Sequence, residues 1–163
     1  KRIVIATFSS NVHRVQQIID TSVKYNRKVA ITGRSMLNVV SAAIELGYMT
    51  VPANTIIDLG EIKKYNPEQL TVITTGSQGE PMSALSRMAY AEHDKVELGP
   101  KDLVVISASP IPGNEKLVGR VINELTKTIE LLSSKEWTME KLKEFVGHTP
   151  IQVLAAMPPF SSK

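Results

Sequence analysis

Cysteine is absent from this 163-residue chain, and aromatic side chains make up only 5% of it. The lack of cysteine excludes disulfides, thiolate zinc sites and a cysteine nucleophile, and it fits a reducing compartment. The shortage of aromatics argues against a broad face that stacks many bases. No apolar run approaches the roughly 18 residues that span a bilayer. From these absences we predict a cytoplasmic protein that makes no membrane contact.

The remaining composition is that of a globular protein, with 42% hydrophobic and 21% charged residues. A chain of this length can build a sizeable core. The net charge is +3 and the isoelectric point is about 9.1. This mild basic bias permits a polyanionic partner without requiring one.

Short apolar runs rich in valine and isoleucine alternate with segments of helical periodicity. Such unbroken runs are typical of strands that are buried on both faces. The strands are predicted at residues 2–8, 28–32, 70–75 and 102–107, with a further short edge strand within 54–59. The helices are predicted at residues 12–25, 35–46, 81–91 and 115–126. This order predicts an α/β fold, a Rossmann-like three-layer sandwich with a mostly parallel sheet of four or five strands.

The chain divides by pattern into an α/β domain at residues 1–127 and a C-terminal appendage at 128–163. Residues 134–146 of the appendage are predicted to be helical, with Trp137, Leu142, Phe145 and Val146 as apolar contacts. The appendage could be a divergent ending of the domain, a junction with another sequence or a foreign addition, and the sequence does not decide between these.

Polar and flexible residues gather where each predicted strand gives way to a helix. The four junctions read "FSSNVHR" (8–14), "TGRSM" (32–36), "TTGSQGEP" (74–81) and "SASPIPGNE" (107–115). In a parallel sheet all four lie at the carboxyl edge, where open α/β sheets bind ligands. Helix N-termini point their N–H groups and positive dipole ends toward that edge, which suits a phosphate.

We predict that phosphate-binding residues come from these junctions, and we expect Gly76 and Gly79 to bring backbone N–H groups close to a phosphate. Capping explains part of each junction, because Ser and Asn are good N-caps and Pro81 suits a first helical position. It does not explain the five positions of "GSQGE". The candidate residues are Ser9, Ser10, Asn11, His13, Arg14, Gly33, Arg34, Ser35, Gly76, Ser77, Gln78, Gly79, Glu80, Ser109, Gly113 and Asn114.

Basic residues occur at the starts of two predicted helices, where positive charge opposes the helix dipole. His13 and Arg14 begin the first helix, and Arg34 precedes the second. An anionic ligand would explain this placement. The structural alternative is that Arg14 simply reaches an acidic neighbour.

Other site types find no support. The three histidines, His13, His93 and His148, are isolated and form no metal-binding spacing. The chain also lacks a Gly-x-Ser-x-Gly elbow, a Walker lysine and a dinucleotide fingerprint. We therefore predict no catalytic residue, metal site or cofactor in this chain itself.

At the junctions the sequence resembles a known family. The stretches "IATFSSNVHRVQQIID", "GRSM", "TTGSQGEPMSALSRMA" and "SASPIPGN" resemble the β-CASP domain of bacterial ribonuclease J, a metallo-β-lactamase nuclease, over residues 2–125. The resemblance implies a single-stranded RNA partner, clamped against a zinc-binding metallo-β-lactamase domain of the same parent protein. It further implies a homo-oligomeric enzyme that is both a 5′-to-3′ exonuclease and an endonuclease.

The departures from the family concern its catalytic motifs. The zinc-binding His-x-His-x-Asp-His motif does not occur, and residues 128–163 hold nothing like the later His-x-Ser-Gly-His motif. We therefore predict a domain that positions RNA for hydrolysis by zinc held elsewhere. Two alternatives stay open: a freestanding Rossmann-like domain that binds a nucleotide or sugar phosphate, and a purely structural module.

Overall fold

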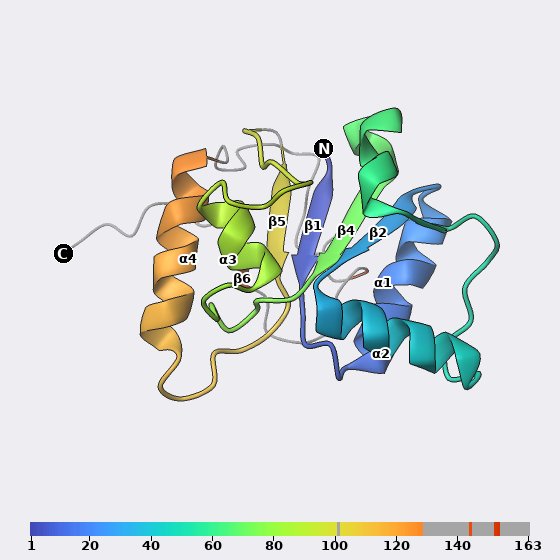
Figure 1. The fold of residues 1–163 in the computed structure, drawn as a ribbon, viewed down its shortest axis with the longest axis horizontal. Coiled ribbons are helices and arrows are strands. Elements are labelled where there is room, and N and C mark those ends of the chain that lie inside the picture. The colour runs from blue at the N-terminus through green and yellow to red at the C-terminus, as the bar shows by residue number, and fades with distance from the viewer. Residues whose placement is uncertain (101, 129–143, 145–151, 154–163) are drawn as a thin grey trace.

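A computed structural model describes residues 1–100, 102–128, 144 and 152–153. Among these residues, six strands form one sheet in the order β3-β2-β4-β1-β5-β6 (Figure 1). The strands are β1 (Ile3–Ala6), β2 (Lys28–Thr32), β3 (Ile56–Ile57), β4 (Leu70–Thr74), β5 (Leu103–Ile106) and β6 (Gln152–Val153). The first five pair in parallel, and β6 pairs antiparallel with β5. The predicted α/β fold with a mostly parallel sheet is confirmed.

Helices cover both faces of the sheet, which gives the three predicted layers. On one face, α1 (Val12–Lys24) and α2 (Arg34–Glu45) pack on one set of strand side chains. On the other, α3 (Ala84–Ala89) and α4 (Glu115–Thr128) pack on the alternate set, near the 3₁₀ helix η1 (Leu59–Lys64). A second 3₁₀ helix, η2 (Pro67–Gln69), leads into β4. Every residue of β1, β4 and β5 is buried, which explains their unbroken apolar sequences.

The predicted helix at 81–91 proved too long, because α3 begins only after Ser83. Met82 has a φ of +65°, outside the helical region, and Ser83 is extended. The Ser83 hydroxyl then accepts a hydrogen bond from the Ser86 N–H at 3.3 Å and caps the helix. Pro81 therefore lies in the preceding turn and not at the first helical position.

The connections between strands change direction across the sheet at the neighbouring strands β1 and β4. From β1 the chain passes through α1 to β2, whereas from β4 it passes through α3, on the opposite face, to β5. The loops that follow β1 and β4 therefore diverge to opposite faces. Such a switch point at the carboxyl edge is where open α/β sheets hold ligands.

The C-terminal segment is described only in part. The helix predicted at 134–146 lies outside the described residues apart from position 144, and β6 comes from the segment predicted as an appendage. The boundary at 127 stays a prediction. Within the described ranges, no helix is long and apolar enough to cross a membrane.

Candidate nucleic-acid interface

The four strand-to-helix junctions lie at the carboxyl edge of the sheet (Figure 1). Hydrogen bonds join the end of β1 to the third junction, and the first junction to the fourth. The Thr7 N–H, just after β1, donates to the Thr74 carbonyl at the end of β4 at 3.1 Å. The Arg14 Nη1 in α1 donates to the Ser107 Oγ after β5 at 2.7 Å. The residues predicted to act together are thus brought to one edge.

Gln78 ties the third junction to the fourth. Its buried side-chain amide donates from Nε2 to the Ser109 carbonyl at 3.0 Å, and its Oε1 accepts from the Ile111 N–H at 2.7 Å. The Asn114 Nδ2 adds a longer contact to the same Oε1 at 3.4 Å. The Gln78 amide therefore holds the proline-containing loop 108–114 in place.

The glycines of the second and third junctions lie in close contact with neighbouring protein atoms. A β-carbon on Gly33 would come within 2.5 Å of the Thr75 Oγ1, and one on Gly76 within 2.3 Å of the Ser83 Oγ. The Gly79 N–H donates to the Gly76 carbonyl at 3.1 Å. Close packing alone therefore explains why glycine occupies these positions, whether or not they also contact a ligand.

The predicted cations lie on the accessible part of this edge. His13 and Arg34 are exposed, Arg14 is half-buried, and the first turns of α1 and α2 contain no acidic residue. The Asn11 side chain caps α1 by accepting the Arg14 N–H at 3.1 Å. Partial burial lowers the pKa of the Arg14 guanidinium, which nevertheless stays charged at neutral pH. This end of the sheet is therefore suited to an anion.

Exposure separates the candidate residues into an accessible rim and a buried frame. The exposed members are Ser10, Asn11, His13, Arg34, Ser35, Glu80, Ser109 and Gly113. The half-buried members are Ser9, Arg14, Gly33 and Asn114. The buried members are Gly76, Ser77, Gln78 and Gly79. The exposed and half-buried members form the rim, which can contact a ligand directly. The buried members form the frame, which holds the loops of the rim in place.

Sequence reasoning missed the part that His93 plays at this edge. Its Nδ1 accepts from the N–H groups of Lys95 and Val96 at 3.2 and 3.1 Å, so the ring proton resides on Nε2. Nε2 then donates to the Thr32 Oγ1 at 3.1 Å, at the end of β2. Because Thr32 lies 61 residues away in sequence, no local signal could have revealed the contact.

This geometry predicts a pH-dependent stability. Burial, followed by Arg87 and Lys95 and partly offset by Asp94, lowers the pKa of His93 below its ordinary 6.5. As the pH falls, His93 therefore binds a proton in the unfolded chain before it does so in the folded one. Its contribution to the free energy of unfolding is complete above about pH 6.5 and is lost as the pH falls further. Urea unfolding between about pH 7.5 and 5.5 should show this loss. His93→Gln should remove it and His13→Gln should keep it; equal slopes in all three proteins would contradict the assignment.

The described residues do not fit a metal ion. Within the described part of the chain, no three His, Cys, Asp or Glu side chains lie close enough together to hold one. The ring nitrogens of His93 are both engaged in hydrogen bonds. Among the residues that the structure describes, the zinc that the family resemblance implies therefore has no ligand set.

Comparison with known proteins identifies the family. The family model of the ribonuclease J β-CASP domain matches residues 1–125. Ribonuclease J of Helicobacter pylori is 51% identical over 126 residues, which cover 77% of this chain and 18% of that protein. Ribonuclease J of Thermus thermophilus is 48% identical over 124 residues, which cover 76% of this chain and 22% of that protein.

These matches agree with the resemblance seen in the junction motifs and extend over the same part of the chain. The chain spans only about a fifth of the length of these relatives. Over residues 1–125 it belongs to the β-CASP domain family of ribonuclease J.

Proposed function

We propose that this domain binds single-stranded RNA along its carboxyl edge, through the rim of the four junctions. The observation that carries the proposal is the placement of His13, Arg14 and Arg34 in first helical turns that lack acids, at the edge where the junctions meet. A run of phosphates would satisfy both these cations and the helix N-termini. We infer from family membership that the anionic ligand is RNA, because the relatives are named as ribonucleases.

In the parent protein, this edge would hold the RNA backbone against a metallo-β-lactamase domain that carries the zinc ions. Hydrolysis, in the 5′-to-3′ exonucleolytic and the endonucleolytic mode, would belong to that domain. The role of the present chain is then to bind and orient the RNA. A cytoplasmic, homo-oligomeric parent enzyme is part of the same proposal.

Salt-dependent RNA binding tests this role. The affinity of the chain for a single-stranded oligonucleotide should fall with salt, by a log–log slope of roughly −0.7 per phosphate contact. Arg14→Ala and Arg34→Ala should each flatten the slope by about that amount, because each removes one cation from the rim. Fluorescence anisotropy over a salt series measures the slope, and thermal melting checks the fold.

The matched control is Lys63→Gln, which removes an exposed cation from η1 instead. Lys63→Gln should leave the salt slope unchanged, and Arg14→Lys should keep most of the wild-type slope. Salt-independent binding, or tight binding of a mononucleotide in place of the oligonucleotide, would favour a small-nucleotide domain.

A further inference from the structure

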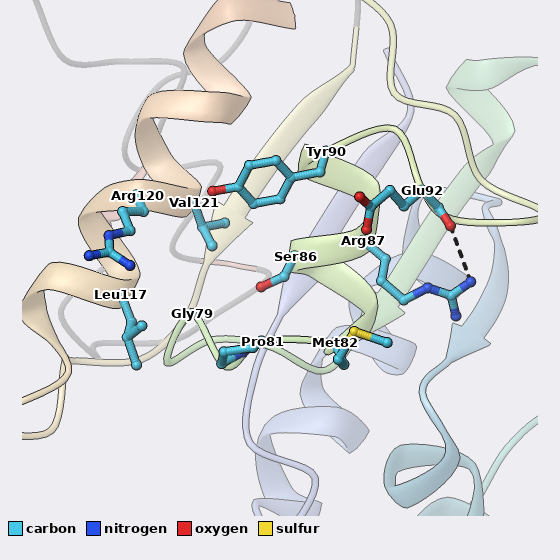
Figure 2. Close-up of a pocket in the computed structure, with 10 residues that line it drawn as sticks. All are labelled: Gly79, Pro81, Met82, Ser86, Arg87, Tyr90, Glu92, Leu117, Arg120 and Val121. Atoms are coloured by element: carbon cyan, nitrogen blue, oxygen red, sulfur yellow. Dashed lines mark hydrogen bonds between the residues drawn. The ribbon is translucent and has the colours of Figure 1, made fainter.

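A slot of about 320 Å³ lies between α3 and α4, beside the end of the loop that follows β4 (Figure 2). Pro81 and Met82 form one rim, and Leu117 and Val121 of α4 form the far wall. Its volume is at the lower end of the range, roughly 300 Å³ upward, for small-molecule pockets. The walls are mostly apolar, so a ligand here is held chiefly by contact with apolar atoms.

The side chain of Tyr90 lines this slot. Tyr90 directly follows α3, and Figure 2 shows its ring extending toward Val121. The side chain is 46% exposed and that of Met82 is 80% exposed. Across the described residues, the Tyr90 hydroxyl makes no hydrogen bond, so the ring is not fixed by a polar partner. A flat aromatic ligand could stack here at little cost in lost protein contacts.

Charge around the slot is uneven. Arg87 is engaged, because it donates to the Asp94 Oδ1 at 2.7 Å and to the Glu92 carbonyl at 3.1 Å. Arg120, on the α4 side, is exposed and has no hydrogen-bond or ion-pair partner among the described residues; the same is true of Lys116, one turn earlier. The exposed Glu92 also lines the slot, next to Arg87, so negative charge lies on that side and positive charge on the α4 side. A ligand with an anionic group next to its apolar body would therefore place that group at α4.

We propose that this slot holds one nucleobase of the RNA strand, stacked on Tyr90 with an adjoining phosphate at Arg120. The inference rests on the proposed RNA-binding function. Gly79 and Pro81 belong to the junction after β4, so the slot opens directly from the edge where we place the RNA. A hydrophobic protein segment would also suit the apolar walls, but this continuity and the cations on the α4 side favour a nucleotide.

The slot should accept different bases. Its walls present few donors and acceptors that could distinguish one base edge from another. Stacking on an aromatic ring is sequence-tolerant, because every base has a π-face. Any preference should follow stacking area, with purines above pyrimidines.

Tyr90→Leu tests the stacking, because it removes the ring and keeps an apolar side chain of moderate size. Binding of an oligoadenylate of about ten nucleotides to the full chain should weaken about fivefold or more, whereas Tyr90→Phe should stay within about twofold. Arg120→Gln should weaken binding and flatten the salt slope, and Lys63→Gln should do neither. In a 5-iodouridine oligonucleotide, photocrosslinks should map to residue 90 in the wild type and in Tyr90→Phe.

The outcomes separate this inference from the proposed function. If Tyr90→Leu binds RNA like the wild type while Arg14→Ala weakens binding, RNA binds at the carboxyl edge but does not enter the slot. If the wild type binds no RNA, both proposals fail. A change in sedimentation of Tyr90→Leu with unchanged RNA affinity would assign the slot to a protein partner. Should Tyr90→Leu melt at a lower temperature, the Arg120→Gln affinity and the crosslink position decide.

Discussion

Gly79→Ala is expected to lower the free energy of unfolding by about 2–4 kcal/mol, from left-handed backbone strain and overpacking together. Gly79 has a φ of +69°, which a residue with a side chain adopts at a cost. Its new β-carbon would lie 2.5 Å from the Leu117 carbonyl carbon and 2.6 Å from the Val118 nitrogen. Because these are backbone atoms of α4, the contact can be relieved only by moving the helix or the loop.

Gly47→Ala is the matched control, since Gly47 has a similar φ of +75°, but a β-carbon there would have no atom beyond its chain neighbours within 4 Å. It should cost only the strain, about 1 kcal/mol. Chemical denaturation of the two variants measures the difference. Equal losses in both would mean that α4 gives way easily, and that the packing of Gly79 is not important for stability.

The same pair of variants bears on the RNA-binding edge. The sequence predicted Gly79 as a point of close approach to phosphate, while the structure directs its N–H to the Gly76 carbonyl and packs its α-carbon on α4. We therefore expect stability to fall first in Gly79→Ala, with RNA affinity following it. Loss of affinity in a variant of unchanged stability would show that the glycine itself meets the RNA.

The sheet could be predicted closely because burial on both faces leaves a simple mark in the sequence. The bounds of β2 at 28–32 agree with the prediction, and β4 differs by one residue at its end. Continuous Val and Ile runs between flexible junctions allow few other structures. The convergence of the junctions on one edge followed from the parallel order alone.

The contacts between junctions could not be predicted, because each depends on residues far apart in the chain. Gln78 lies in a segment whose sequence is typical of a ligand-binding loop, yet its amide is buried against the loop at 108–114. His93 is isolated in the sequence, and only the fold places it against Thr32. The slot beside Tyr90 likewise exists only because α3 and α4 pack side by side (Figure 2). A sequence pattern marks the edge but not which of its polar groups face solvent.

Asp102→Ala is expected to destabilise the domain by about 3–5 kcal/mol, the usual cost of removing one partner of a buried ion pair. The Asp102 carboxylate accepts from the Arg2 Nε at 3.1 Å, from the Arg2 Nη2 at 2.5 Å and from the Gly99 N–H at 2.8 Å. The two side chains are only 8% and 14% exposed. Without the carboxylate, the Arg2 guanidinium would keep its hydrogen bond to the Glu97 carbonyl but lose its neutralising charge.

Asp94→Ala is the matched control, because Asp94 also pairs with an arginine but is 80% exposed. Its loss should cost no more than about 1 kcal/mol. Arg2 and Asp102 lie at the amino ends of β1 and β5, opposite the proposed RNA edge. Asp102→Ala should therefore lower the unfolding midpoint in urea and leave RNA affinity unchanged at temperatures where the domain is folded. A small stability loss, similar to that of Asp94→Ala, would show that water or another group replaces the carboxylate, because only a charge left buried without a partner carries the larger cost.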